Sequence, residues 1–226
     1  MRIEERSYST KIVRPRPAIY IEPDGSFIVI STSWGDPEHG LKVNDDIAKY
    51  IQAAKADVEV TSPFEFLTSL SVEANYLRIA TLISNESLYR GSNKTEYQAG
   101  VETLLLLRKG SLMAYAQVGS PHLLIQKKNQ LVTPISVGFE AVLEMSGEDQ
   151  DLLSPLPQSL LGIDGNVNVR TGDFRIDESD RLLLYGGSVW PKSLWSPDCD
   201  FQQLTQKLVQ ASPESPFWLG VVSLED

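Results

Sequence analysis

Asp180-Arg-Leu-Leu-Leu-Tyr-Gly-Gly-Ser188 is the stretch of this sequence that most constrains the fold. The run from Arg181 to Tyr185 predicts a β-strand. Two glycines and a serine follow it, so we expect the strand to end in a turn there. Upstream, Leu160-Leu161-Gly162 leads into an extended segment that reaches Ile176.

Hairpin signals surround this stretch. Residues 19–30 contain two apolar, β-branched runs joined by a Pro23-Asp24-Gly25 turn. Two more strand pairs and three single strands are expected further along the chain. The second pair is Thr103 to Leu107 and Leu112 to Val118, joined by Arg108-Lys109-Gly110; the third is Leu123 to Gln126 and Leu131 to Ile135, joined by Lys127-Lys128-Asn129-Gln130; the single strands are 167–169, 174–176 and 218–224.

Two successive segments have helical periodicity. Residues 40–56 carry apolar side chains at intervals of three and four, which builds one apolar stripe. Residues 62–87 have a similar stripe. We expect this second helix to start at Ser62, because Pro63 suits the first helical position and Glu65 completes a capping box.

A third helix is expected from Asp200 to Gln210. Because hairpins dominate the rest of the chain, the sheets should be mostly antiparallel, with the helices packed outside them. The pattern therefore predicts an α+β protein with two sheets or one large sheet. We find no internal repeat, low-complexity tract or linker, so a single domain over residues 1–226 is expected.

Composition narrows the class of protein. The 226 residues are 42% hydrophobic and 22% charged, which is ordinary for a globular chain. The net charge of −10 argues against a nucleic-acid partner and against an anionic membrane, because both would repel this surface. Cys199 is the only cysteine, so no disulfide can form within the chain. With a polar N-terminus and no run of about 18 apolar residues, we expect a cytoplasmic protein.

Taken in order, these motifs resemble the metal-dependent protein phosphatases of the 2C type, the PPM family. The resemblance covers nearly the whole chain and implies a PP2C-like fold, a central antiparallel β-sandwich flanked by helix pairs in α-β-β-α layers. A bacterial source would suit the short form. The family's "gDrlLLcSDGL", "fvVaDGmGGh", "GtT…vGDSRaYl" and "DN.TvvvV" are similar to residues 180–188, 27–35, 100–124 and 215–222.

The chain does not keep the metal-binding aspartates of those motifs. The metal-binding aspartates of the family correspond here to five residues without a carboxylate: Pro17, Thr32, Ser120, Gly187 and Ser215. Shifting the alignment by one residue restores an acid only at the last position, through Glu214.

The loss matters because the family reaction uses a water held between two Mg²⁺ or Mn²⁺ ions. Those hard ions require anionic oxygen ligands. The resemblance therefore implies a pseudophosphatase with no catalytic residues, no metal and no other cofactor.

Several acidic residues could still form a relocated site. Asp36, Glu38 and His39 cluster just after Trp34, where a new metal site is conceivable, although a solvated turn before a helix is the favoured explanation of the acids. Glu102 stands where the family has a small threonine. It could bind a cation, but an ion pair with a basic residue or exposure to solvent is the favoured interpretation.

Four further residues suggest more specific hypotheses. Ser120 and His122 could suggest a nucleophile and its base, but Pro121 predicts a loop or edge position and no third, orienting acid can be named. Trp34 and Trp190 are expected at the rim of the vacated cleft. They would either fill it or serve as exposed anchors for a partner protein.

Three functions follow from these observations. The first is a catalytically inactive pseudophosphatase that acts as a regulatory or protein-binding module, with a kinase or phosphoprotein as the partner by family analogy. The second is a divergent phosphoprotein phosphatase that recruits Mg²⁺ or Mn²⁺ through Asp36, Glu38, Glu102 or Glu214. The third is a scaffold subunit whose tryptophan-lined cleft holds a peptide.

Overall fold

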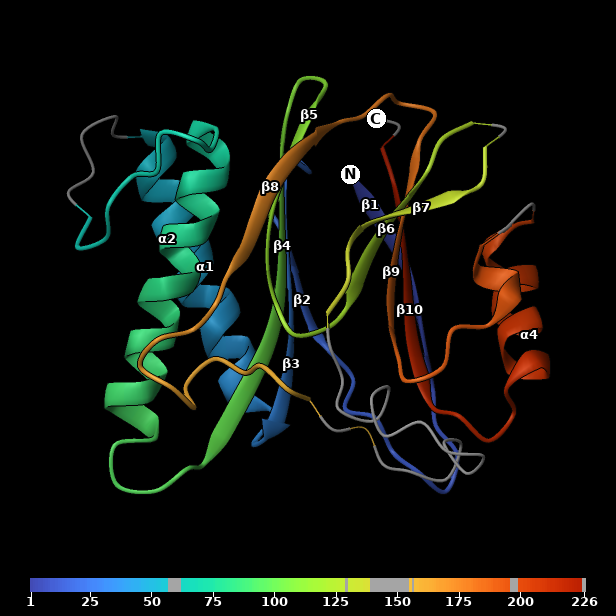
Figure 1. Ribbon diagram of the computed structural model, residues 1–226, viewed down its shortest axis with the longest axis horizontal. Coiled ribbons are helices and arrows are strands. Elements are labelled where there is room, and N and C mark those ends of the chain that lie inside the picture. Colours follow the sequence, from blue (N-terminus) through green and yellow to red (C-terminus); the bar gives the residue numbers. More distant parts are fainter. Residues whose placement is uncertain (57–61, 129, 139–154, 156, 196–198, 225–226) are drawn as a thin grey trace. The chain divides into compact units, whose positions relative to one another are not determined.

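The computed structural model describes residues 1–56, 62–128, 130–138, 155, 157–195 and 199–224. The chain divides into two compact units, each with a five-stranded antiparallel sheet (Figure 1). The predicted α+β class with two sheets is therefore confirmed. The first unit comprises Met1–Arg16, Ser120–Gln158 and Asp177–Asp226, and the second comprises Pro17–Gly119 and Ser159–Ile176.

The sheet of the second unit has the strand order β2-β3-β4-β5-β8. Its central strands β3 and β4 are almost wholly buried, as their near-continuous apolar sequences require. All neighbouring strands are antiparallel, and hairpins connect β2 to β3 and β4 to β5. The strands are β2 (Ala18–Ile21), β3 (Phe27–Gly35), β4 (Ala99–Lys109), β5 (Leu112–Val118) and β8 (Arg170–Arg175).

The turns of this sheet fall where the sequence predicted them. Gly25 in the β2–β3 turn has φ 66° and Gly110 in the β4–β5 turn has φ 60°, conformations that suit a residue without Cβ. The Ser26 backbone N–H donates to Asp24 Oδ1 over 2.8 Å. This bond holds the pKa of the Asp24 carboxyl below its usual value.

Helices α1 (Glu38–Ala56) and α2 (Val72–Ser87) cover one face of the sheet, and α2 continues into one π-helical turn, η1 (Leu88–Ser92) (Figure 1). Alternate residues of the strands face these helices, since side chains alternate across a strand. Together they form a core with the apolar stripes of both helices, which includes Phe27, Val29, Val101, Leu105, Ile47, Ile51 and Leu77.

The predicted start of the second helix was wrong. The helix begins at Val72, and Ser71 is its N-cap, whose Oγ accepts a hydrogen bond from the Ala74 backbone over 3.2 Å. Ser62 instead accepts from the backbone N–H of Phe64 in a local turn. The capping-box pattern was therefore present, but its serine caps no helix.

A buried amide explains why the chain before α2 is not helical. The Asn75 side chain accepts a hydrogen bond from the Leu67 backbone N–H and donates to the Leu67 carbonyl. It also donates to the carbonyl of Leu70. These bonds satisfy the loop backbone in place of a helical ladder, and no local sequence signal reveals them.

The sheet of the first unit has the order β1-β10-β9-β6-β7 and is antiparallel throughout. The helix α4 (Phe201–Ala211) packs on one face of it and lies where the sequence predicted a helix, with Asp200 as its N-cap. A short 3₁₀ turn, η3 (Lys192–Leu194), adjoins that helix. The strands are β1 (Arg2–Tyr8), β10 (Phe217–Ser223), β9 (Arg181–Gly187), β6 (His122–Gln126) and β7 (Val132–Ser136).

Two strand predictions need correction. Residues 167–169 and 174–176 were expected to form separate strands, but one strand, β8, occupies Arg170–Arg175. Strand β1 was not predicted at all, because its sequence is dominated by charged side chains rather than by alternating apolar ones. The β6–β7 turn forms with Gln130 N–H donating to the Lys127 carbonyl, while Asn129 of that predicted turn lies outside the described residues.

The chain passes back and forth between the two units, and a single domain over 1–226 stays a prediction. No helix among the described residues has the length and apolar character needed to cross a membrane.

The corrected start of α2 yields a stability prediction. We expect Ser71→Ala to lower the free energy of unfolding by about 1 kcal/mol, because the helix loses the acceptor for its Ala74 N–H. The control is Ser62→Ala, which should change it by less than about 0.5 kcal/mol. Urea unfolding of both variants measures the difference. Equal losses of unfolding free energy in the two variants would contradict Ser71 as the N-cap and favour a helix that starts at Ser62.

Candidate functional site

In the second unit, Glu102 and Trp34 lie together on the sheet face opposite the helices. Glu102 of β4 stands directly across from Thr32 of β3, and Trp34 lies two residues further along the same strand. The Trp34 indole Nε1 donates to Glu102 Oε2 over 2.9 Å. Thr32, one of the five positions that lack the family aspartate, is 3% exposed and carries no charge.

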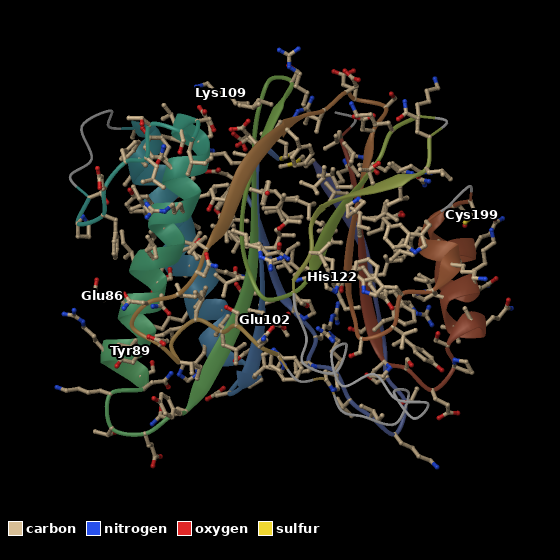
Figure 2. All side chains as sticks on the ribbon, in the orientation of Figure 1. Glu86, Tyr89, Glu102, Lys109, His122 and Cys199 are labelled. Carbon is tan, nitrogen blue, oxygen red and sulfur yellow. The ribbon has the colours of Figure 1, made fainter. Side chains whose placement is uncertain are left out.

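The Glu102 carboxylate is completely buried, with an exposed fraction of 0%. It lies against the backbone of Gly119, where a Cβ atom would stand 2.5 Å from Glu102 Oε1. Gly119 has φ 70°, so both its conformation and this contact require glycine. The expectation that Glu102 might simply be exposed to solvent is therefore wrong. Figure 2 labels the side chain on β4.

The acids after Trp34 serve the N-terminus of α1. Asp36 Oδ1 accepts from the Glu38 backbone N–H over 3.0 Å, and the Asp36 carbonyl accepts from the His39 N–H. Asp36 and Glu38 are exposed. This arrangement is a capping turn that favours the helix dipole. Among the described residues, no three His, Cys, Asp or Glu side chains gather as metal ligands do.

In the first unit, the buried side chain of Arg14 lies beside the end of β9. It is 5% exposed, and its Nη2 donates to Ser120 Oγ over 2.9 Å. A Cβ at Gly186 would lie 3.2 Å from Arg14 Nε and 3.3 Å from Ser120 Oγ. The absence of a side chain at Gly186 thus makes room for the guanidinium beside the end of β9.

The same contact bears on the hypothesis of a Ser120–His122 pair. The Ser120 hydroxyl accepts a hydrogen bond from a guanidinium, which stays protonated and cannot act as a general base. His122 is fully buried at the start of β6, where its ring lies 4.4 Å from the Trp190 ring and 6.4 Å from the Tyr185 ring. These ring neighbours are aromatic, as in a packed core. Figure 2 labels His122.

Gly187, the second glycine of the opening motif, is covered by Tyr185 of the same strand. A Cβ at Gly187 would stand 2.5 Å from the Tyr185 hydroxyl oxygen. The ring cannot swing away easily, because its hydroxyl donates to the Val189 carbonyl over 2.7 Å and its face packs on Phe217. The space that an aspartate side chain would need is therefore filled by tyrosine.

Trp190 is half-buried in an aromatic cluster of the first unit. Its ring stacks on Trp195 with centroids 5.4 Å apart and an interplanar angle of 15°. It also lies 5.9 Å from the ring of Tyr185. Trp34 is half-buried as well, so neither tryptophan is a wholly exposed anchor or a wholly buried filler.

The remaining two positions offer no ligand atoms of the required charge. Pro17 is buried at the start of the second unit and has no side-chain oxygen. Ser215 is 6% exposed just before β10, and its backbone N–H donates to the Ser212 carbonyl. The donor set at the five positions is therefore one glycine, one proline and three hydroxyls. It does not fit a pair of hard divalent cations, which need carboxylate oxygens.

Sequence reasoning missed three residues that shape these places. The structure gives a role to Arg14, Gly119 and Tyr185, of which Gly119 and Tyr185 lie within the stretches that resemble the family motifs. The part played by Tyr185 depends on the ring lying over its own strand, which a one-dimensional pattern does not reveal.

Comparisons with known proteins agree with this fold. No family model matches the sequence, and no curated protein matches it. Among solved structures, the PPM Ser-Thr phosphatase MsPP from Mycobacterium smegmatis, in complex with cacodylate, is 12% identical with a TM-score of 0.66 over 99% of this chain and 98% of that one. The serine/threonine phosphatase Stp1 from Staphylococcus aureus is 13% identical with a TM-score of 0.64, over 99% and 95%.

A third structure, a bacterial serine phosphatase, is 14% identical with a TM-score of 0.66 over 100% of this chain and 98% of the other. Similarity at this level of identity establishes the fold. The protein thus has the fold of the PPM serine/threonine phosphatases over nearly its whole length, as the sequence motifs implied.

The packing at Gly187 gives a direct prediction. We expect Gly187→Ala to destabilise the protein by about 1–3 kcal/mol, because the new methyl overlaps the Tyr185 hydroxyl. Gly91→Ala is the matched control, since no atom lies within 4 Å of its Cβ position, and it should be neutral or slightly stabilising. Thermal unfolding compares the two, and equal melting temperatures would show that Tyr185 does not cover Gly187.

Proposed function

We propose that this protein is a catalytically inactive, PP2C-like pseudophosphatase that acts as a regulatory or protein-binding module. One observation carries the proposal. The buried guanidinium of Arg14 binds Ser120 and lies against Gly186, beside the strand end where the related fold would present a metal-binding aspartate. At this place the Arg14 guanidinium is hydrogen-bonded to the neutral Ser120 hydroxyl, whereas a metal site would need a cluster of carboxylates.

Electrostatics makes this arrangement unsuitable for metal-dependent hydrolysis. Two unit charges of the same sign 4 Å apart repel by about 4 kcal/mol at an effective dielectric constant of 20, and a divalent ion doubles that figure. Hydroxyl groups of threonine and serine cannot offset such repulsion, because they carry no charge. The Glu102 carboxylate supplies one negative charge, which is too little for two divalent ions.

In this proposal the fold serves as a binding surface for another protein and does not catalyse a reaction. We propose a protein as the partner, and specifically a kinase or a phosphoprotein, by analogy with the phosphatases that share the fold. The net charge of −10 supports a protein over a nucleic acid or an anionic membrane. Half-buried aromatic residues such as Trp34 and Trp190 are of the type found at interface hot spots.

Metal binding and turnover separate this proposal from the divergent phosphatase. Calorimetric titration with Mn²⁺ should give no saturable heat, and p-nitrophenyl phosphate with Mn²⁺ should be hydrolysed no faster than in a buffer blank, because the described part of the chain holds no cluster of carboxylates that could bind the ions. The matched variants are Glu102→Gln and Asp36→Asn with Glu38→Gln. Turnover by the wild type that either variant abolishes would establish an active enzyme with relocated ligands.

The partner-binding half of the proposal has its own test. Trp190→Ala should reduce capture of a kinase or phosphoprotein partner by at least about tenfold if this aromatic cluster anchors it, since a hot-spot residue contributes about 2 kcal/mol or more. Trp34→Ala tests the second unit in the same way. Tyr97→Ala is the control, because Tyr97 is an exposed aromatic outside both clusters. Binding that survives both tryptophan changes would exclude these surfaces.

A further inference from the structure

Strand β1 forms an open edge of the sheet in the first unit. It pairs with β10 from Arg2↔Ser223 to Tyr8↔Phe217, and no described strand pairs with its other side. Backbone N–H and C=O groups of alternate residues therefore point away from the sheet, where they can pair with another strand. The strand has seven residues, which is long for an uncovered edge.

One face of β1 carries exposed charges of both signs. Arg2, Glu4, Arg6 and Tyr8 share this face because they alternate along the strand. The three charged residues are exposed, and the side chain of none of them forms an ion pair or hydrogen bond with another described residue. Tyr8 is half-buried, and its hydroxyl donates to the Pro213 carbonyl over 2.8 Å.

A groove runs beside this face, between β1 and α4. It has a volume of about 430 Å³ and is lined by Arg6 and Tyr8 from the strand and by Gln202, Thr205, Gln206, Val209 and Gln210 from the helix. Among these described lining residues Arg6 alone is charged, so they carry one positive charge and no negative one. The groove suits an entering side chain that is acidic and comes from a strand laid along the edge.

We propose that a second copy of this chain occupies the edge, through antiparallel pairing of β1 with the same strand of the other copy. A two-fold axis perpendicular to the sheet passes between the two copies of Glu5. In this register Glu4 of each copy lies opposite Arg6 of the other, which gives two opposite-charge pairs on the exposed face. Each Glu4 then enters the groove beside Arg6 of the other copy. Arg2 of each copy lies opposite the aromatic ring of Tyr8.

Other symmetric registers are less favourable. Centring the axis on Glu4 places Arg2 opposite Arg6 and Glu4 opposite itself, and centring it on Arg6 places Arg6 opposite itself. Like charges directly across a strand pair are destabilising. Centring it on Ile3 keeps Arg2 opposite Glu4 but pairs only residues 1–5, and centring it on Ser7 places no opposite charges across from each other. The strand therefore favours the register centred on Glu5, which pairs residues 2–8 and keeps two opposite-charge pairs.

The proposed register also places Glu5 opposite Glu5, but this residue is already neutralised within its own chain. Its Oε1 forms an ion pair with Arg16, and its Oε2 accepts from the Trp218 indole Nε1 over 2.7 Å. Glu5 lies on the other face of the strand, because it alternates with Glu4 and Arg6. The dimer does not depend on the proposed loss of catalysis, and either can hold without the other.

A charge-swap experiment tests the dimer. Sedimentation equilibrium of the full chain, carrying any tag at the C-terminus, should show a concentration-dependent dimer that weakens as salt is raised. E4R and R6E should each weaken it by at least about tenfold, because two attractive pairs become repulsive. An equimolar mixture of E4R and R6E should associate again, since each strand position then faces a side chain of opposite charge on the other chain. The E4R/R6E double variant should dimerise for the same reason.

A folding control and three possible results complete the test of the dimer. Circular dichroism and melting temperatures of both single variants should match the wild type, since both positions are exposed. A wild type that stays monomeric into the millimolar range would overturn the dimer. So would a dimer that both single variants retain, because it would lie elsewhere, and so would single variants that do not associate when mixed, because the register would be wrong.

Discussion

A buried guanidinium constrains how the first unit packs around the end of β9. Arg14 is 5% exposed, and removing such a charge from water without compensating contacts costs several kcal/mol. Its hydrogen bond to Ser120 and its close approach to Gly186 meet part of that cost, and both contacts need small residues at those places. The glycine pair that ends β9 is therefore a packing requirement. Gly186 makes room for Arg14, and Gly187 lies beneath Tyr185.

The second unit also buries an ionisable side chain, in this case the acidic Glu102. Glu102 is completely buried, and a carboxylate in that position must accept hydrogen bonds. Trp34 donates one from the next strand, and Gly119 lets the backbone approach the carboxylate closely. Within each unit, then, a buried ionisable side chain lies next to a residue that the sequence resemblance aligns with a family aspartate: Arg14 binds Ser120, and Glu102 stands across from Thr32. The fold is kept, and we propose that the chemistry is replaced by fixed protein charges.

Much of the fold could be predicted from the sequence because its core strands are strongly apolar. The hairpins at Asp24-Gly25 and Lys109-Gly110, the strands β9 and β10 and the helix that follows Asp200 all follow from local patterns. Predictions failed where a distant partner decided the local structure. Asn75 holds the loop before α2 out of the helix, and the charged strand β1 forms because β10 lies beside it.

The candidate site was harder to predict for the same physical reason. The sequence marked Trp34 and Glu102 separately, but only the register of β3 against β4 brings the indole and the carboxylate together. Asp36, Glu38 and His39 are close in sequence and looked like ligands, yet the first two are exposed around a helix N-terminus. Burial and register, which determine what a polar side chain can do, are properties of the folded sheet.

The central claim is that this fold no longer holds metal ions, and diffraction measures that directly. Crystals grown with Mn²⁺ and measured with X-rays near the manganese absorption edge would show each bound ion as an anomalous peak. We predict no peak near Ser120, Gly187, Thr32 or Glu102, with the Arg14 guanidinium still bound to the Ser120 hydroxyl. One or two peaks coordinated by carboxylates of this chain, with Arg14 displaced, would contradict the claim.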